Sequence, residues 1–287
     1  MTLPLMIKHA FFAGIALLCS ACSPVGVMNA LIPSGGYRSY QDIAYQQGER
    51  RMLDLYVPAH GHSHGVVVFF YGGSWESGRR QDYRFVAEAL TARGYSVVIP
   101  DYRKYPDVVF PAFVEDAAAA VAWVHRHIAE YGGDPGRIFV AGHSAGAHLA
   151  ALLALDPRYL QAQGMSPMDL RGMIGLAGPY DFLPLQTARL NAVFPGEHLQ
   201  FLSQPVNVLQ TPNPPVLLLV GLKDKTVLPR NSESLAQHIQ RAGGKAELRY
   251  FKDYGHINMV LKLARPFRGD GDLLETIVEF MNRQLAD

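Results

Sequence analysis

The sequence predicts a single α/β domain, in which a mostly parallel, doubly wound β-sheet begins with an antiparallel hairpin and carries a small cap. Two observations lead to this fold class. Short, uninterrupted runs of valine, isoleucine, leucine and phenylalanine recur along the chain, and segments with helical periodicity separate them. Such runs are typical of strands buried on both faces of a parallel sheet, and their alternation with helices is typical of α/β proteins.

The composition is that of an ordinary globular protein, with 287 residues, of which 49% are hydrophobic and 18% charged. The formal net charge is +1 and no basic or acidic block is present, so nothing favours a nucleic-acid partner, and a small, neutral substrate fits better. The two cysteines, Cys19 and Cys22, lie in or beside the leader. The predicted domain therefore has neither a disulfide nor a thiol nucleophile.

The first residues follow the pattern of a secretory signal peptide. Lys8 and His9 precede an apolar run over residues 10–18, which is too short to span a bilayer comfortably. The small residues before Cys22 resemble the lipobox of bacterial lipoproteins, although Cys19 stands where that motif usually has leucine. The leader therefore predicts export and a lipid anchor in the membrane, attached at Cys22.

Three parts of the chain follow from this pattern: a signal peptide over residues 1–21, a tether over 22–39 and the folded domain over 40–287. Ordinary cleavage to a secreted form and retention of the leader as an uncleaved anchor stay open as alternatives. In all three cases the domain lies outside the cytoplasm.

The domain opens with a predicted hairpin, residues 40–46 and 51–57, joined by a turn at Gln47 and Gly48. Alternating apolar and polar residues around Leu53 indicate strands that face solvent on one side. The expected buried strands are residues 66–70, 96–100, 138–141, 173–176 and 216–220, and residues 246–251 also resemble a strand.

Three helices are indicated by apolar residues three and four positions apart. The first ends at Gly132 and Gly133, the second ends at Gly243 and Gly244, and the third opens at Asp272. Glu275 is expected to form a capping pair with Asp272. Their apolar positions are Val114, Ala117, Val121, Val124 and Ile128, then Leu235, Ala236, Ile239 and Ala242, then Leu274, Ile277, Met281 and Leu285.

Two regions, residues 156–170 and 180–215, do not fit the alternation. Irregular segments of this length beside a site usually act as lids or pocket walls, so we expect substrate choice to be set there. The histidines at 60, 62 and 64 lie in a loop without a nearby carboxylate or cysteine, which favours a solvated turn over a metal site. No metal and no cofactor is expected.

A nucleophile is indicated by the sequence GHSAG at residues 142–146, which follows one apolar run and opens a helix rich in alanine. This strand, turn and helix are the setting of a nucleophile elbow, where glycines allow the strained backbone of the central serine. Ser144 is therefore the predicted nucleophile. A serine hydroxyl needs a base to take its proton, so a histidine must come from elsewhere in the fold.

His256 is the predicted base, because it lies in a short loop after the last strand run. Asp224 follows the preceding strand run and is expected to accept the other N–H of the imidazole, which fixes its tautomer. Asp253 is the competing acid. His143 and His148 flank the serine, but the local backbone directs both away from its hydroxyl, so they are expected to be packing or pocket residues.

An oxyanion hole is indicated by YGGSW at residues 71–75, directly after the strand run 66–70. The expected donors are the backbone N–H groups of Gly73, Ser74 and Ala145, each worth roughly 3 kcal/mol at the transition state. Trp75 and His143 are the expected substrate-pocket residues.

With these motifs the chain resembles the α/β-hydrolase esterases of the hormone-sensitive-lipase and prenylcysteine-methylesterase-like groups, close to carboxylesterases and kynurenine formamidases. The resemblance covers roughly residues 40–285 and also includes DYR at 101–103 and YGGDP at 131–135. It implies that DYR braces the oxyanion loop through a buried ion pair. One departure is Tyr71, which stands where the family's loop usually begins with a histidine.

The sequence as a whole predicts a serine carboxylic ester hydrolase that acts on short-acyl or small esters through an acyl-enzyme intermediate. Short acyl chains are expected because the sequence shows no long, strongly apolar lid. Two alternatives stay open: an amidase such as a formamidase, which would use the same three residues, and a non-catalytic binding protein on a hydrolase fold. The oligomeric state is not indicated.

Overall fold

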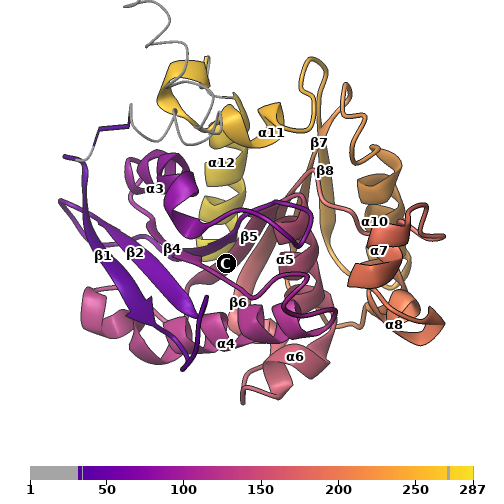
Figure 1. Ribbon diagram of the computed structural model, residues 1–287. Helices are drawn as coiled ribbons and strands as arrows, with labels where there is room; N and C mark the ends of the chain where they lie inside the picture. Colours follow the sequence, from indigo (N-terminus) through magenta and orange to yellow (C-terminus); the bar gives the residue numbers. More distant parts are fainter. Residues whose placement is uncertain (1–31, 34, 270–271, 287) are drawn as a thin grey trace, which may run out of the picture.

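The computed structural model describes residues 32–33, 35–269 and 272–286 (Figure 1). The predicted signal peptide, Cys22 and most of the tether lie outside the described residues. The first strand begins at Tyr37, so regular structure starts inside the segment expected to be a tether. None of the helices within these described ranges has both the length and the apolar character needed to cross a bilayer.

One eight-stranded sheet forms the centre of the domain, in the order β1-β2-β4-β3-β5-β6-β7-β8. β2 runs antiparallel to both β1 and β4, and all other neighbours are parallel, which confirms the predicted mostly parallel sheet with an antiparallel start. The strands are β1 (Tyr37–Ala44), β2 (Met52–Pro58), β3 (Val66–Phe70), β4 (Ser96–Pro100), β5 (Ile138–His143), β6 (Leu170–Leu176), β7 (Val216–Gly221) and β8 (Ala246–Phe251).

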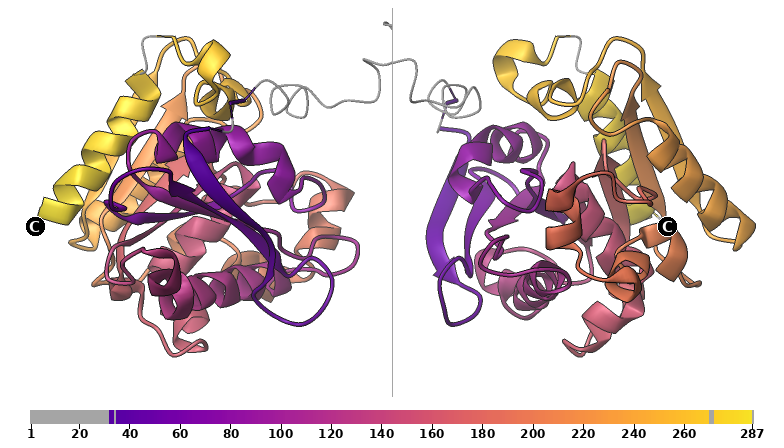
Figure 2. Two further views of the ribbon diagram at one scale, coloured as in Figure 1. Left: turned by 90° about the vertical axis from the view of Figure 1, so that its left-hand side faces the viewer. Right: turned by 45° about the vertical axis from the view of Figure 1, so that its right-hand side comes forward.

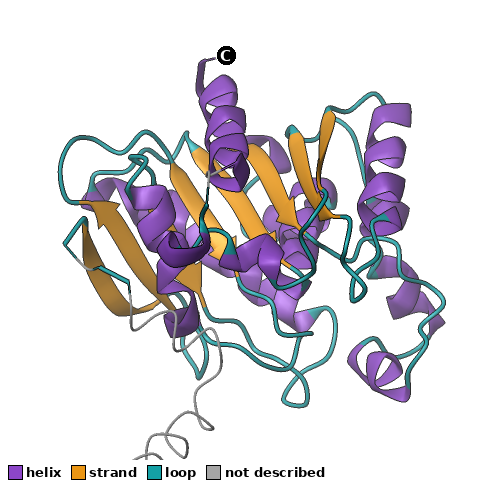
Figure 3. Cartoon of the chain, turned by 90° about the horizontal axis from the view of Figure 1, so that it is seen from above, coloured by secondary structure: helices purple, strands orange, loops and turns teal. Residues whose placement is uncertain are grey.

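Helices cover both faces of this sheet (Figures 1 and 3). On β8, Tyr250 bonds to Glu233 of one helix and Glu247 pairs with Arg283 of another, so these two helices lie on opposite faces. The helices that pack on the sheet are α3 (Arg84–Thr91), α4 (Ala112–His127), α5 (Ala145–Leu155), α10 (Arg230–Arg241) and α12 (Asp272–Ala286). Single turns of 3-10 helix are η2 (Arg80–Tyr83), η3 (Ile128–Tyr131), η4 (Pro167–Asp169) and η5 (Arg265–Phe267).

Helix α5 is buried on every side, and its sequence AGAHLAALLAL explains how this is possible. Small alanine side chains let the helix axis approach β5 and β6 closely, and no polar face has to reach water. The helix that carries the nucleophile is thereby fixed to the centre of the sheet.

The predicted exposure of the hairpin is wrong for β2. This strand lies between β1 and β4, and its residues from Leu53 to the end are all buried. Asp54, which suggested a solvent-facing position, is only 1% exposed because the guanidinium of Arg80 lies 2.9 Å away and neutralises it. The polar residue in this alternating pattern is therefore one half of a buried ion pair and does not mark a solvent-facing side of the strand.

The final helix begins at Asp272 as predicted, but Glu275 makes an ion pair with Arg93. Arg93 follows α3, so this contact joins the end of α3 to the start of α12. Glu275 therefore links two helices that lie on the same face of the sheet.

The two irregular regions contain short helices and have different roles. The first forms α6 (Pro157–Gln161) and η4, and it follows the C-terminal end of α5, opposite the end that carries Ser144. The second forms α7 (Ala188–Val193), α8 (Glu197–Leu202) and α9 (Pro205–Val208), which lie beside α10 (Figures 1 and 2). This second region is the small cap. A last short helix, α11 (Asn258–Leu261), follows the loop after β8.

Candidate active site

Ser144 lies in a sharp turn between β5 and α5, with φ +55° and ψ −123°. This strained conformation is possible because two glycines allow a close approach of the backbone. A Cβ on Gly142 would overlap the backbone of Gly146, and a Cβ on Gly146 would overlap the carbonyl oxygen of Phe70. The turn projects the serine hydroxyl at the carboxyl edge of the sheet.

The structure brings together the three residues that the sequence analysis selected. His256 Nε2 lies 2.9 Å from Ser144 Oγ, and His256 Nδ1 lies 2.8 Å from Asp224 Oδ2. Because the carboxylate can only accept, Nδ1 carries the proton and Nε2 is left to accept from the serine hydroxyl. Ser144, His256 and Asp224 thus form one hydrogen-bonded relay from three separate loops.

Asp224 is held in place as an ionised acceptor. Its Oδ1 accepts hydrogen bonds from the N–H groups of Thr226 at 2.8 Å and Val227 at 2.9 Å, while Oδ2 faces His256. Burial alone would raise its pKa, but these hydrogen bonds and the nearby imidazole outweigh burial and lower it. The carboxylate therefore stays charged, as a partner for an imidazolium must.

His143 does not line the substrate pocket, contrary to expectation. It is buried beneath His256, with ring centroids 4.8 Å apart, and its Nε2 donates to the carbonyl oxygen of His256 at 3.0 Å. Burial, with the neighbouring His256, lowers its pKa to about 3. A neutral His143 therefore supports the loop that carries His256.

The remaining competitors lie elsewhere. His148 is fully buried, accepts from Trp75 Nε1 at 3.2 Å through Nδ1 and donates through Nε2 to Ser203 O at 2.6 Å. Asp253 is exposed and pairs with Lys223 at 2.6 Å. Neither side chain is hydrogen-bonded to Ser144, His256 or Asp224.

The predicted oxyanion loop follows β3 and faces the nucleophile. Gly72 packs against Ser144, and the N–H groups of Gly73, Ser74 and Ala145 donate to no other group within the described residues. Gly73, Ser74 and Trp75 have φ values of +130°, +55° and +61°, a left-handed run that L-residues rarely adopt. Three donors are thus free to bind an anionic oxygen.

A buried ion pair lies beneath this loop and includes Asp101 of the DYR segment, but its cation is Arg80 and not Arg103 of that segment. Asp101 accepts from the backbone N–H of Arg80 at 2.9 Å and pairs with its guanidinium. Tyr71, which stands where the family usually has a histidine, donates a hydrogen bond to Asp101 Oδ1 at 2.6 Å. Arg103 pairs instead with Asp116, at 2.8 Å.

A cavity of about 310 Å³ opens beside the nucleophile, with Ser144, Ser74 and Trp75 in its lining. The predicted pocket role of Trp75 therefore agrees with its position. Sequence reasoning did not identify the other wall residues, because they come from the aperiodic segment between β6 and β7, from the loop after β7 and from the first turn of α10. These are Pro179, Phe182, Thr187, Arg189, Leu190, Thr226, Val227 and Asn231.

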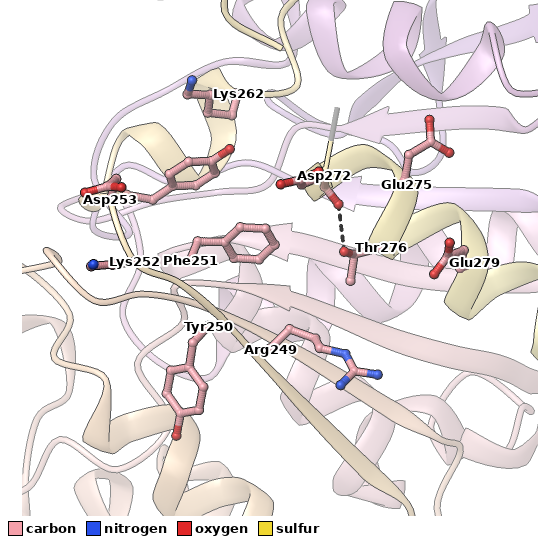
Figure 4. Close-up of a pocket in the computed structure, with 11 residues that line it drawn as sticks. Arg249, Tyr250, Phe251, Lys252, Asp253, Lys262, Asp272, Glu275, Thr276 and Glu279 are labelled. Atoms are coloured by element: carbon pink, nitrogen blue, oxygen red, sulfur yellow. Dashed lines mark hydrogen bonds between the residues drawn. The ribbon is translucent and has the colours of Figure 1, made fainter. Parts of the chain in front are cut away.

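A larger groove of about 700 Å³ lies between β8 and α12 and contains none of the relay (Figure 4). Asp272, Glu275 and Glu279 from α12 form one wall, and Arg249 from β8 lies across from them (Figure 4). The mixture of charges gives the groove no clear preference for one ligand.

The histidines at 60, 62 and 64 are exposed in the loop between β2 and β3. Over residues 35–269 and 272–286, no group of three or more histidine, cysteine, aspartate or glutamate side chains is arranged to hold a metal ion.

Comparisons with known proteins agree with this geometry. Residues 53–239 match the BD-FAE family. The protein named "Probable isoprenylcysteine alpha-carbonyl methylesterase ICMEL1" of Arabidopsis thaliana is 31% identical over 263 residues, which are 83% of this chain and 55% of that protein. The chain thus spans about half the length of this relative.

Solved structures extend the comparison. Butyrate-bound esterase Est2 of Thermogutta terrifontis is 26% identical with a TM-score of 0.71, covering 87% of this chain and 94% of that one. Esterase B of Lactobacillus rhamnosis has a TM-score of 0.79 at 19% identity, with 96% of each chain covered, and supports the fold alone. On these matches the chain belongs to the BD-FAE family and has the fold of the α/β-hydrolase esterases.

Proposed function

We propose that the protein is a serine carboxylic ester hydrolase that cleaves small esters with short acyl chains through an acyl-enzyme intermediate. The observation that carries the proposal is the hydrogen-bonded relay of Ser144, His256 and Asp224 at the mouth of a cavity that also meets free backbone donors. The relationship to proteins named as esterases supports the same reaction class.

In the proposed mechanism, Ser144 Oγ attacks the ester carbonyl carbon while His256 Nε2 takes its proton. The carbonyl oxygen becomes an oxyanion, which accepts hydrogen bonds from the N–H groups of Gly73, Ser74 and Ala145. The imidazolium, stabilised by Asp224, then gives its proton to the departing alkoxide. An acyl-enzyme remains on Ser144.

Water completes the cycle. His256 takes a proton from a water molecule while the water oxygen attacks the acyl carbon. A second oxyanion then forms and accepts hydrogen bonds from the same three N–H groups. Collapse of this intermediate returns the proton to Ser144 and releases the carboxylic acid. No other reactant is required.

The size and lining of the cavity favour short acyl groups. The cavity has a volume of about 310 Å³, which fits a small acyl group. The apolar side chains of Trp75, Phe182 and Leu190 in its lining can contact the carbon atoms of that group. The Thermogutta esterase, whose structure holds butyrate, is consistent with this preference. Medium and long chains would have to leave the cavity for solvent.

A series of p-nitrophenyl esters tests this proposal. We expect kcat/KM to be highest for acetate, butyrate or hexanoate and to fall at decanoate and laurate, since the cavity cannot hold these longer chains and their apolar carbons stay exposed to water. A matched pair, p-nitrophenyl butyrate and butyryl p-nitroanilide, separates esterase from amidase. Faster turnover of the long esters would contradict the short-acyl proposal, and preference for the anilide would support the amidase alternative.

We also propose export and lipid attachment at Cys22, for which the support is the sequence of the leader alone. We expect the membrane fraction of a bacterial expression host to contain a form whose N-terminal peptide starts at a diacylated cysteine. Mass spectrometry of that peptide checks this, and an unmodified Cys22 in membrane-associated protein would contradict it.

A further inference from the structure

The oxyanion loop, residues 71–78, must hold an unfavourable backbone. Gly73, Ser74 and Trp75 have positive φ in succession, and Gly78 has φ +90°. Ser74 and Trp75 lack the freedom of glycine, so other contacts have to maintain this conformation. Within the loop, the N–H groups of Glu76 and Ser77 donate to Gly73 O at 3.0 Å. These bonds close the turn but do not attach it to the domain.

Trp75 is attached through His148 and Glu76 through Arg189, and the segment after β4 contacts both ends of the loop. Tyr102 Oη donates to Tyr71 O at 2.8 Å, and the N–H of Tyr105 donates to Trp75 O at 2.9 Å. Between these two residues, Lys104 Nζ donates both to Tyr71 Oη and to Gly78 O, each at 2.8 Å. One ammonium group therefore joins the first and last residues of the loop.

Lys104 is an unusual residue to find there. It is 2% exposed, and no carboxylate within the described part of the chain lies within ion-pairing distance of its Nζ. Its charge is balanced indirectly, because Tyr71 Oη accepts from Lys104 and donates to Asp101 Oδ1 at 2.6 Å. The ammonium also lies 4.9 Å from the ring centroid of Tyr71 and 5.2 Å from that of Tyr102.

This arrangement has an energetic disadvantage. Burial lowers the pKa of Lys104 to about 8, which shows that the site opposes the positive charge. An apolar side chain of equal length would fill the same space without this penalty. What the apolar side chain could not do is bond to both ends of the loop at once.

We propose that Lys104 is a positioning residue that aims the oxyanion donors. By joining Tyr71 to Gly78, it fixes the turn between them, and with it the directions of the N–H groups of Gly73 and Ser74. This inference rests on the proposed function, because those N–H groups matter only if an oxyanion forms. Lys104 itself has no part in the proton transfers.

The test is Lys104→Met, which keeps the four-atom length of the apolar stem and removes the ammonium group with its donors. We expect kcat for p-nitrophenyl butyrate to fall about 10- to 100-fold with KM changed less than about twofold, since the oxyanion contacts strengthen only at the transition state. Lys252→Met, at an exposed lysine outside the site, should leave both constants unchanged. Gly73→Ala gives the reference for a displaced loop, since its Cβ would overlap Ser77 O.

A second measurement does not depend on activity. Amide hydrogen exchange of residues 72–78 should be faster in Lys104→Met than in the wild type and in Lys252→Met, while exchange in α5 should be unchanged. Tyr71→Phe, which keeps the bond from Lys104 to Gly78, should lose less kcat than Lys104→Met. The loss in the double variant should be smaller than the product of the two single losses, because both changes break the bond between Lys104 and Tyr71.

Three results would overturn the proposal: a folded Lys104→Met variant with the kcat of the wild type, a loss that appears only in KM, or unchanged exchange in the loop. If Lys104→Met does not fold, Tyr71→Phe, which removes one of the two Lys104 bonds, should still show a lower kcat and faster exchange in the loop, and the absence of both effects would overturn the proposal. A wild-type protein without any esterase activity would contradict the proposed function instead, and the exchange measurement would still test whether Lys104 orders the loop.

Discussion

Replacement of Ser144 by alanine is expected to reduce kcat for p-nitrophenyl butyrate by about 10⁴- to 10⁶-fold. The hydroxyl that lies 2.9 Å from His256 Nε2 is the only atom of the side chain that can bond to the acyl carbon. Without it the remaining donors can only assist a direct attack by water, which leaves a small residual rate. Steady-state kinetics with purified Ser144→Ala protein measure the loss.

A fluorophosphonate probe provides the complementary measurement. It should label the wild type at Ser144, as located by peptide mass spectrometry, and should not label Ser144→Ala. Equal thermal unfolding of the two proteins would exclude misfolding as the cause. Absence of labelling in folded wild-type protein would favour the non-catalytic alternative, in which the same fold serves only for binding.

Asp224→Asn should lower kcat by about 10⁴-fold, the second largest effect that we expect. Asparagine has the shape of aspartate but presents an amide N–H₂, so it can no longer accept from His256 Nδ1 while it also accepts from Thr226 and Val227. The imidazole would then favour the wrong tautomer, and the imidazolium formed during attack would lose its counter-charge. KM should change little, since the carboxylate does not contact the substrate.

Asp253→Asn is the matched control for this experiment. It makes the same chemical change three residues before His256, at an exposed carboxylate that pairs with Lys223. We expect its kcat to stay within about twofold of the wild type, because surface ion pairs contribute little. A large loss of kcat in Asp253→Asn together with a small loss in Asp224→Asn would mean that Asp253, and not Asp224, is the acid that orients His256.

Local chemistry explains why part of this architecture could be predicted from the sequence. The strand at Val66–Phe70 is apolar throughout because both faces of the sheet are covered, so its pattern is visible without any knowledge of its neighbours. The turn around Ser144 requires glycine on both sides for steric reasons that apply wherever it occurs. Asp224 and His256 follow strands, and the carboxyl ends of parallel strands meet at one edge.

Long-range contacts explain what could not be predicted. Asp54 has the pattern of a surface residue, and only the position of Arg80 shows that it is buried. His143 is adjacent to the nucleophile in sequence, but its ring supports a carbonyl group from a loop more than a hundred residues away. The cap residues Phe182 and Leu190 show no periodicity, because Phe182 stacks on Trp75 and Leu190 lines the same cavity, and neither lies on the face of a regular amphipathic element.

The cap is inserted between β6 and β7, which pair with each other in the sheet. Both ends of the inserted segment are therefore held in place by the sheet. Its length and sequence can therefore change during evolution without altering the spacing of the reacting groups, which belong to the ends of other elements. Recombination or loop grafting confined to residues 178–213 should alter the range of compounds accepted while the reaction itself is inherited unchanged. The fold in this way separates the evolution of selectivity from that of chemistry.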